Sequence, residues 1–496
     1  MDDTKSTMAS TGIAGLDNVL AGGFLRGRVF LLEGSPGTGK TTIATQFLLA
    51  GAAAGEKTLY ITLSETEEEL RESAQSHGWS LDGVDIFELV PPENLLDDQQ
   101  QQSLLYSSDL ELGETTRRIF EAFERYRPDR VVLDSLSEIR LLAQSSLRYR
   151  RQILALKHYF ARQKATVLML DDMTTELTDK TVHSVAHGVV TLEELQREYG
   201  PERRRLRVVK YRGRRFRGGF HDFTIETGGV RVFPRLVSAE HHRPMLRDNV
   251  TTDIAPLNVL LGGGIERGSS VLILGPAGTG KSLLALTFIS SAVGRGEKAA
   301  MFVFDEELGL LIQRAKQLGI DLQDMIDNDH LVLEQVDAAE LTPGEFADRV
   351  RRCVELQGAQ TVVVDSLNGY QAAMPEENAL ILHLHELLQY LNRRGATTLL
   401  TVAQHGLVGD MKAPVDVTYL ADTVILLRYF EALGRVRRAI SVVKKRTGQH
   451  EDTIREYRIG GAAISVGEPL IEFQGVLRGV PVLAGGETKL LDELGS

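Results

Sequence analysis

A long internal repeat constrains the fold of this 496-residue chain more than any other feature of its sequence. IAGLDNVLAGGFLRG, at residues 13–27, matches IAPLNVLLGGGIERG, at residues 254–268. GSPGTGKTT, at residues 34–42, matches GPAGTGKSL, at residues 275–283, and VVLDSLSEI pairs with VVVDSLNGY further along. The repeat is far longer than a solenoid unit, so it indicates a duplicated domain.

Each copy alternates short apolar runs with segments of helical spacing. VFLLEG stops at a glycine, as a buried parallel strand does, and TLYITL, RVVLDS and TVLMLD have the same character. TTIATQFLLAGAAAG, ETEEELRESAQSHG and TTRRIFEAFERYR are typical of helices. This order predicts an α/β fold with two tandem domains, each a mostly parallel sheet with helices on both faces. We expect the domains at residues 1–236 and 250–496, with the polar segment 237–249 as a linker.

Composition and charge limit the class of protein. The chain is 43% hydrophobic and 25% charged, which is typical of a globular protein, and its net charge of -12 argues against a general nucleic-acid coat. The single cysteine, Cys353, excludes an intrachain disulfide and fits a reducing compartment. The sequence shows neither a secretory leader nor an apolar run of membrane-spanning length, so we expect a cytoplasmic protein without membrane contact.

Residues 34–41 and 275–282 both fit the pattern G-x-x-x-x-G-K-[ST] of a phosphate-binding loop. Each follows an apolar strand and precedes a helix, which is the context that this motif requires. Its glycines let backbone N–H groups turn toward phosphates, its lysine reaches the outer phosphates, and its last hydroxyl binds Mg²⁺. Both domains are therefore predicted to bind nucleotide. The expected ligands are Gly34, Gly37, Thr38, Gly39, Lys40, Thr41 and Thr42 in the first domain and Gly275, Gly278, Thr279, Gly280, Lys281, Ser282 and Leu283 in the second.

An aspartate ends one apolar run in each domain. Asp134 follows VVL and Asp365 follows VVV, where a carboxylate lies at the carboxyl edge of the sheet. Together with the hydroxyls of Thr41 and Ser282, these aspartates form the predicted metal sites. The alternative role for each aspartate is to cap the helix that follows.

Further carboxylates lie between each loop and its aspartate. Glu65 occurs in LSET, and Asp305 and Glu306 occur in FDEE, in both cases after an apolar strand. A carboxylate in this place can polarise an attacking water or hydroxyl, so these three residues are the catalytic candidates. The alternative is a solvated helix start, because acidic residues are favoured at a helix N-terminus.

Together these residues resemble the KaiC family of double-domain RecA-like ATPases along almost the whole chain. The resemblance also covers GLDNVLAGG, ERRRLRVVKYRG and RAISVVKKRTGQHEDTIREY. It implies ATP as the nucleotide and a double-ringed homo-hexamer with nucleotide between neighbouring subunits. The pair Lys210 and Arg212, and the pair Lys444 and Arg446, resemble the cations that reach the phosphates of the adjacent subunit. For ERRRLRVVKYRG, an exposed basic strand or a nucleic-acid stripe is the alternative.

In clock members of the family, the first domain hydrolyses ATP slowly. The second domain phosphorylates its own subunits on two adjacent hydroxyl residues and later reverses the reaction. The resemblance places Thr418 and Tyr419 at these positions, just before DTVILL. Clock members have serine and then threonine, so Thr418 is the better acceptor, whereas the phenol of Tyr419 departs from the pattern. The resemblance implies a serine/threonine-type autokinase. Alternatively, Thr418 and Tyr419 are ordinary strand residues at a subunit interface, and the protein is an ATPase scaffold without kinase activity.

Two other departures from the family bear on function. Members have two adjacent glutamates in each domain, whereas this chain has Ser64 and Glu65 in the first and Asp305 and Glu306 in the second. We therefore expect slower or altered hydrolysis at the first site, and Asp305 as the base for the acceptor hydroxyl. GGETKLLDELGS is shorter than the tail that recruits the activator KaiA, so a KaiA-independent protein is expected, and a KaiB-like partner is left open. A DNA-binding RecA-type motor is an alternative, which the net negative charge of the chain disfavours.

Overall fold

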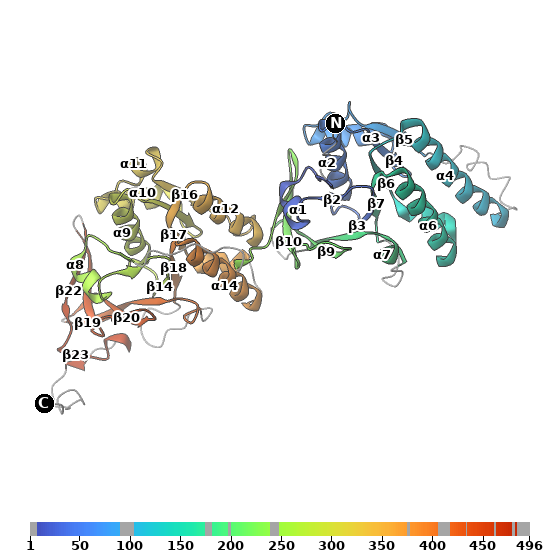
Figure 1. Ribbon diagram of the computed structural model, residues 1–496. Helices are drawn as coiled ribbons and strands as arrows, with labels where there is room; N and C mark the ends of the chain where they lie inside the picture. Colours follow the sequence, from blue (N-terminus) through green and yellow to red (C-terminus); the bar gives the residue numbers. More distant parts are fainter. Residues whose placement is uncertain are drawn as a thin grey trace. The chain divides into compact units, whose positions relative to one another are not determined.

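The protein consists of two compact units, Met1–Arg235 and Leu236–Ser496 (Figure 1). The computed structural model describes residues 7–89, 104–173, 181–196, 200–238, 248–373, 377–404, 417–432, 434–460, 463–478 and 482–483. Residues 239–247 of the expected linker and the C-terminal segment 485–496 lie outside the described residues.

A nine-stranded sheet forms the centre of the first unit, with the strand order β11-β10-β9-β8-β3-β7-β6-β4-β5. From β8 to β5 all neighbours are parallel, and β9, β10 and β11 continue the sheet in antiparallel pairs. The strands are β3 (Val29–Glu33), β4 (Thr58–Thr62), β5 (Asp85–Glu88), β6 (Arg130–Asp134), β7 (Thr166–Asp171), β8 (Gly188–Leu195), β9 (Arg203–Tyr211), β10 (His221–Glu226) and β11 (Gly229–Phe233).

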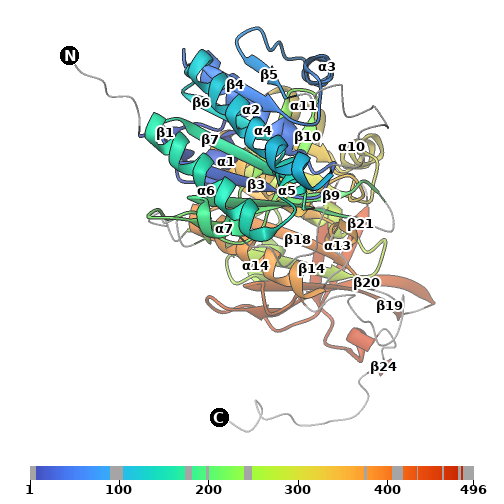
Figure 2. The ribbon, with the colours of Figure 1, turned by 90° about the vertical axis from the view of Figure 1, so that its right-hand side faces the viewer.

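Helices cover both faces of this sheet, because alternate residues of each buried strand point to opposite sides. Phe30 and Leu32 of β3 pack with α1, α2 and α3, whereas Val29 and Leu31 pack with α4, α5 and α6. The last three helices lie side by side over the sheet (Figure 2). The helices are α1 (Ala14–Val19), α2 (Lys40–Ala53), α3 (Glu67–Ser76), α4 (Leu104–Tyr126), α5 (Leu136–Ala143), α6 (Ser146–Gln163) and α7 (Thr181–Val185).

The second unit repeats this architecture with the order β16-β15-β17-β18-β14-β19-β20-β21-β22. Again the strands from β16 to β19 are parallel and the last three are antiparallel. The strands are β14 (Ser270–Gly275), β15 (Lys298–Val303), β16 (Leu331–Gln335), β17 (Ala359–Asp365), β18 (Thr397–Ala403), β19 (Thr423–Ala432), β20 (Arg435–Lys445), β21 (Arg455–Gly460) and β22 (Ala463–Pro469).

Its helices are divided between the two faces in the same way. Val271 and Ile273 of β14 pack with α8 to α11, and Leu272 and Leu274 pack with α12 to α14. The helices are α8 (Ala255–Leu260), α9 (Lys281–Gly294), α10 (Leu308–Gln317), α11 (Leu322–Asp327), α12 (Pro343–Glu355), α13 (Leu367–Ala373) and α14 (Glu377–Arg394). The predicted α/β fold with two tandem RecA-like domains is therefore confirmed.

Short ribbons complete the structure. They pair β1 (Met8–Ala9) with β2 (Phe24–Leu25), β12 (Asn249–Val250) with β13 (Ile265–Glu266), and β23 (Phe473–Gln474) with β24 (Val482–Leu483). Within the described part of the chain, no helix is both long and apolar enough to cross a membrane.

A buried ion pair fixes the start of β6, the strand that ends at Asp134. Arg130 is 1% exposed, and its guanidinium donates to a carboxylate oxygen of Glu56 at 2.8 Å and to the carbonyl of Phe47 at 2.9 Å. Burial opposes ionisation of Glu56, but hydrogen bonds from Arg26 and Arg130 outweigh it and lower the pKa of Glu56 to about 2. Both charges of the buried pair are therefore compensated, which such a pair requires.

Candidate functional site

The first loop lies between β3 and α2, at the carboxyl edge of the sheet. Gly37 and Gly39 have φ angles of +84° and +92°, a left-handed conformation that glycine adopts without strain. Lys40 is the first residue of α2, and its ammonium donates to the carbonyls of Gly34 and Ser35, both at 2.9 Å. The hydroxyl of the buried Thr38 donates back to Ser35 at 2.8 Å. The free N–H groups at the start of α2 can bind an anion here.

The second loop has the same geometry between β14 and α9. Gly278 and Gly280 have φ angles of +76° and +97°, and Lys281 donates to the carbonyl of Pro276 at 2.9 Å. The hydroxyl of Thr279 donates to the same carbonyl at 2.8 Å, as Thr38 does to Ser35 in the first loop. Burial lowers the pKa of Lys281, and the negative charge of Asp365 partly opposes this shift. Each loop therefore has the conformation of a phosphate-binding loop.

The other residues expected to bind nucleotide lie at the start of the helix that follows each loop. Thr42 lies in the first turn of α2, and Leu283 is buried in the first turn of α9. Ser282 and Leu283 also line a cavity of about 440 Å³ beside the second loop. Its size is within the range of small-ligand pockets. The other polar lining side chains are those of Lys281, Arg314, Gln317 and Arg438.

In the first unit, the two residues expected to bind a metal lie next to each other. The hydroxyl of Thr41 is 3.4 Å from an oxygen of Asp134, and the buried phenol of Tyr60 donates to the same oxygen at 2.6 Å. Burial raises the pKa of Asp134, although the hydrogen bond from Tyr60 works in the opposite direction. A hydroxyl beside a carboxylate fits Mg²⁺, which prefers oxygen ligands and takes others from substrate phosphates.

The second unit stabilises its aspartate from a different strand. The hydroxyl of Thr401, on β18, donates to a carboxylate oxygen of Asp365. Leu170 occupies the place of Thr401 in the first sheet, and Met301 occupies the place of Tyr60 in the second. Each carboxylate thus receives one buried hydroxyl donor, and the two units supply it from opposite neighbouring strands.

The three catalytic candidates have different surroundings. Burial and the charge of Asp134 raise the pKa of Glu65. Asp305 accepts a hydrogen bond from the hydroxyl of Ser366 at 2.5 Å, beside the strand end at Asp365. Glu306 instead forms an ion pair of 2.7 Å with Arg314 of α10, one of the residues that line the 440 Å³ cavity. Of the adjacent pair in the second unit, Asp305 therefore lies closer to the predicted metal residue.

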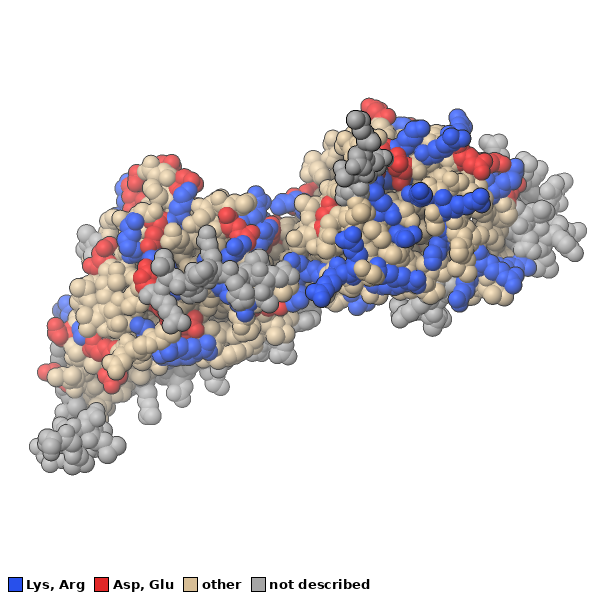
Figure 3. Space-filling view, viewed as in Figure 1, with Lys and Arg blue, Asp and Glu red and all other residues tan. Residues whose placement is uncertain are grey.

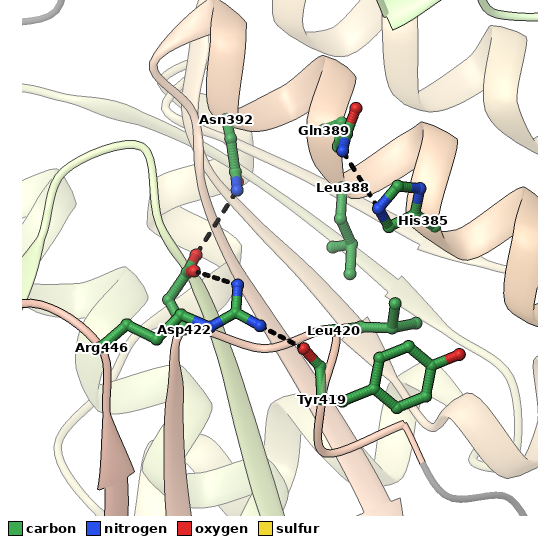
Figure 4. Close-up of a pocket in the computed structure, with 8 residues that line it drawn as sticks. All are labelled: His385, Leu388, Gln389, Asn392, Tyr419, Leu420, Asp422 and Arg446. Atoms are coloured by element: carbon green, nitrogen blue, oxygen red, sulfur yellow. Dashed lines mark hydrogen bonds and ion pairs between the residues drawn. The ribbon is translucent and has the colours of Figure 1, made fainter.

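The segment with Thr418 and Tyr419 is bound by the two cations near the end of β20. The ammonium of Lys444 donates to the carbonyls of Thr418 and Ala421, both at 2.8 Å. Arg446 donates to the carbonyl of Tyr419 at 2.5 Å and lies 3.4 Å from Asp422 (Figure 4). The phenol of Tyr419 points away from this guanidinium and is half exposed. The two cations thus bind the backbone carbonyls of Thr418 and Tyr419.

Lys210 and Arg212 make the matching contacts in the first unit. Lys210 donates to the carbonyls of His183 and Ala186, and Arg212 donates to the carbonyl of Ser184. Thr418 therefore occupies in the second unit the place that His183 has in the first. The imidazole of His183 lies 2.6 Å from the carboxylate of Glu33.

Basic side chains gather over β9 and β10 on the face of the first unit drawn in Figure 3. Three arginines of β9 form ion pairs of 2.7–3.0 Å within the sheet, so carboxylates already compensate much of their charge. These pairs are Arg203 with Asp222, Arg204 with Glu194 and Arg205 with Glu193. A nucleic-acid stripe is not favoured by this arrangement, because phosphate binding relies on uncompensated cations.

Sequence analysis missed three residues near the predicted metal sites: Tyr60, Thr401 and Asp172. Tyr60 and Thr401 are interior residues of apolar strands, and nothing in their local pattern marks them. Asp172 had a visible signal, because it follows the apolar run VLMLD just as Asp134 ends VVLD. Its carboxylate lies 2.9 Å from the ammonium of Lys40.

Two phosphate-binding loops, each at the carboxyl edge of a mostly parallel sheet, define a P-loop ATPase with two RecA-like domains. The chain belongs to the KaiC ATPase family, because the model of that family matches residues 9–237 and 250–471.

Clock proteins are among the similar sequences. The circadian clock protein KaiC3 of Synechocystis sp. is 28% identical over 95% of this chain and 94% of its own length. The circadian clock oscillator proteins KaiC of Acaryochloris marina and Synechococcus elongatus are each 27% identical, over 96% and 95% of this chain and 91% of their own lengths. The match therefore spans both units, as the resemblance in the sequence predicted.

The hydroxyl donors to the two aspartates can be tested by substitution. Tyr60→Phe removes a buried hydrogen bond to a carboxylate, a contact worth about 1.5–3 kcal/mol. We expect the melting temperature of the first unit to fall by several degrees in scanning calorimetry.

Tyr159→Phe is the matched control, because it removes the same phenol hydroxyl from contacts with the Phe120 carbonyl, at 3.4 Å, and with Gln163, and not from a contact with a carboxylate. Equal melting temperatures for Tyr60→Phe and Tyr159→Phe would contradict the importance of the Tyr60 contact.

Proposed function

We propose that this KaiC-family ATPase hydrolyses ATP at its first site and transfers the γ-phosphoryl group of ATP to Thr418 at its second site. The observation that carries the proposal is the position of Thr418. Lys444 binds the backbone at Thr418 and three residues later, through the carbonyls of Thr418 and Ala421. The corresponding place in the first unit holds a histidine, His183, which has no hydroxyl.

Each loop supplies the same nucleotide-binding groups in this proposal. The N–H groups of the loop and the ammonium of Lys40 or Lys281 bind the phosphates. Bound Mg²⁺ would neutralise charge that develops on the phosphates, and its protein ligands would be Thr41 with Asp134, or Ser282 with Asp365. Glu65 and Glu306 are the catalytic candidates other than Asp305. Glu306 forms an ion pair with Arg314, so we assign it a positioning role.

The proposed transfer at the second site is an in-line displacement. Thr418 precedes β19 and so lies at the sheet edge opposite its own loop, where Asp422 bonds the first residue of β14. The Thr418 oxygen of one subunit therefore attacks the γ-phosphorus of ATP bound by the adjacent subunit, the bond from that phosphorus to the bridging oxygen breaks, and ADP leaves with the bond's electron pair. Asp305 of the subunit that binds the ATP accepts the proton of the threonine hydroxyl, since it is the carboxylate beside the strand end at Asp365. Tyr419 is the weaker candidate, because its longer side chain points away from Arg446.

The same chemistry supports a homo-hexameric double ring. Lys210 with Arg212, and Lys444 with Arg446, make equivalent contacts in the two units and would reach the phosphates bound by an adjacent subunit. Nucleotide would then join neighbouring subunits. A role in a circadian clock, as in the named relatives, and a KaiB-like partner are further parts of the proposal.

An ATPase scaffold without kinase activity is the second candidate. It is favoured by Tyr419 in place of a second small hydroxyl residue and by an aspartate, Asp305, in place of glutamate. Both candidates share ATP binding and differ in whether phosphate becomes covalently bound to the chain. A RecA-type DNA motor is disfavoured, because the arginines of β9 are paired within the sheet.

Phosphosite mapping after incubation with labelled ATP and Mg²⁺ separates the two candidates. We expect label on Thr418, loss of label in Thr418→Ala, and retention of label in the matched variant Tyr419→Phe. Lys281→Ala should also abolish labelling, because the second loop then lacks its phosphate-binding cation. An unlabelled wild-type chain that still hydrolyses ATP would contradict the kinase and support the scaffold.

Measurement of the oligomeric state tests whether nucleotide bound at the first loop helps to join neighbouring subunits. Lys40→Ala should reduce the fraction of hexamer measured by light scattering with ATP present, because nucleotide in the first ring contributes to the contact between subunits. Lys57→Ala, an exposed lysine of the same unit, is the control and should assemble as the wild type does. Full assembly of Lys40→Ala would contradict this role of the first loop.

A further inference from the structure

The order of strands brings Asp172 closer to the first loop than the predicted catalytic residue Glu65. Strand β7 lies between β3, which leads into the loop, and β6, which ends at Asp134. Asp172 follows β7 directly, whereas Glu65 follows β4 on the far side of β6. Parallel strands end at the same edge, so Asp172 lies between the loop and the predicted metal residue.

Contacts of Asp172 agree with this position. Its carboxylate lies 2.9 Å from the ammonium of Lys40, the group that binds the outer phosphates in loops of this kind. Its other oxygen accepts a hydrogen bond from Ser137 at 3.2 Å, and the hydroxyl of Ser135 also donates to the carboxylate. The carboxylate is therefore fixed in place and is still partly exposed, at 29% of its side-chain surface.

The serine contact links Asp172 to a residue of the second site. Ser135 follows Asp134 and Ser366 follows Asp365, so the two serines are equivalent in the repeat. Ser366 donates to Asp305, and Ser135 donates to Asp172. The same serine hydroxyl thus binds a carboxylate in both sites, although that carboxylate comes from a different strand in each.

At two equivalent positions of the repeat, one unit has an aspartate and the other has a neutral residue. The first unit has Ser64 where the second has Asp305, and the second unit has Ala403 where the first has Asp172. The aspartate at the strand end, the glutamate and the serine-bound aspartate thus form a matching set of three carboxylates in the two units. They are Asp134, Glu65 and Asp172 in the first unit and Asp365, Glu306 and Asp305 in the second.

We propose that Asp172 is the catalytic carboxylate of the first site and replaces the acidic residue missing at position 64. The inference rests on ATP hydrolysis at this site, as proposed above. Lys40 moves to the phosphates when ATP binds, so the carboxylate loses its ion pair and orients the attacking water. The water oxygen bonds to the γ-phosphorus, the bond to the bridging oxygen breaks, ADP leaves with the electron pair, and Asp172 takes the water proton and returns it to solvent.

The test uses the full chain with Lys281→Ala, so that only the first site can turn over. In this background, Asp172→Asn should lower single-turnover hydrolysis by about 10²- to 10⁴-fold, the usual contribution of a general base. Binding of a fluorescent ATP analogue should be unchanged or tighter, because Lys40 has lost a competing ion pair. Adding Ser64→Glu to Asp172→Asn should restore at least tenfold of the lost rate, since it returns a carboxylate to the position that family members use.

Several results would overturn the inference, and they are distinct. Unchanged hydrolysis in Asp172→Asn means that the carboxylate is not catalytic. A parallel loss of binding and hydrolysis, without rescue by Ser64→Glu, means that Asp172 only positions Lys40. A Lys281→Ala chain that binds the analogue but never hydrolyses ATP contradicts the proposed function of the first site, and the role of Asp172 falls with it.

Discussion

The parallel pairing of the loop strand with its two neighbours is the constraint on which the rest of the structure depends. Strand β3 pairs with β7 and β8, and β14 pairs with β18 and β19. Parallel strands end at one edge, so the loop, the aspartate of the neighbouring strand and the start of a helix meet there. A shift of a strand by one residue would turn every side chain to the opposite face and disrupt its packing against the helices there, so this packing fixes the register.

Within this shared frame, the two sites have exchanged individual side chains. Asp134 receives its buried hydroxyl from Tyr60 and Asp365 receives one from Thr401, so the donor has moved from one neighbouring strand to the other. The carboxylate that the serine binds also comes from a different strand in each unit. It is Asp305, after β15, in the second unit and Asp172, after β7, in the first. Such exchanges keep a carboxylate beside each of the two equivalent serines and change the strand that supplies it.

Sequence alone could predict the features that depend on local pattern. The repeat, both loops, the aspartates at 134 and 365 and the helices on both faces all follow from spacing and apolar runs. Tyr60 and Thr401 could not be found in this way, because only the pairing of strands brings them beside a carboxylate. The ion pair of Glu306 with Arg314 likewise depends on the position of α10, which the sequence pattern does not specify. Asp172 was visible as an acid after an apolar run, but its proximity to Lys40 depends on the strand order.

Both proposed activities require that each unit binds nucleotide through its own loop lysine. Equilibrium dialysis of the full chain with a non-hydrolysable ATP analogue and Mg²⁺ measures this most directly. We expect two nucleotides per wild-type chain, and one per chain in both Lys40→Ala and Lys281→Ala. A single nucleotide per wild-type chain, or two nucleotides retained in either variant, would contradict it.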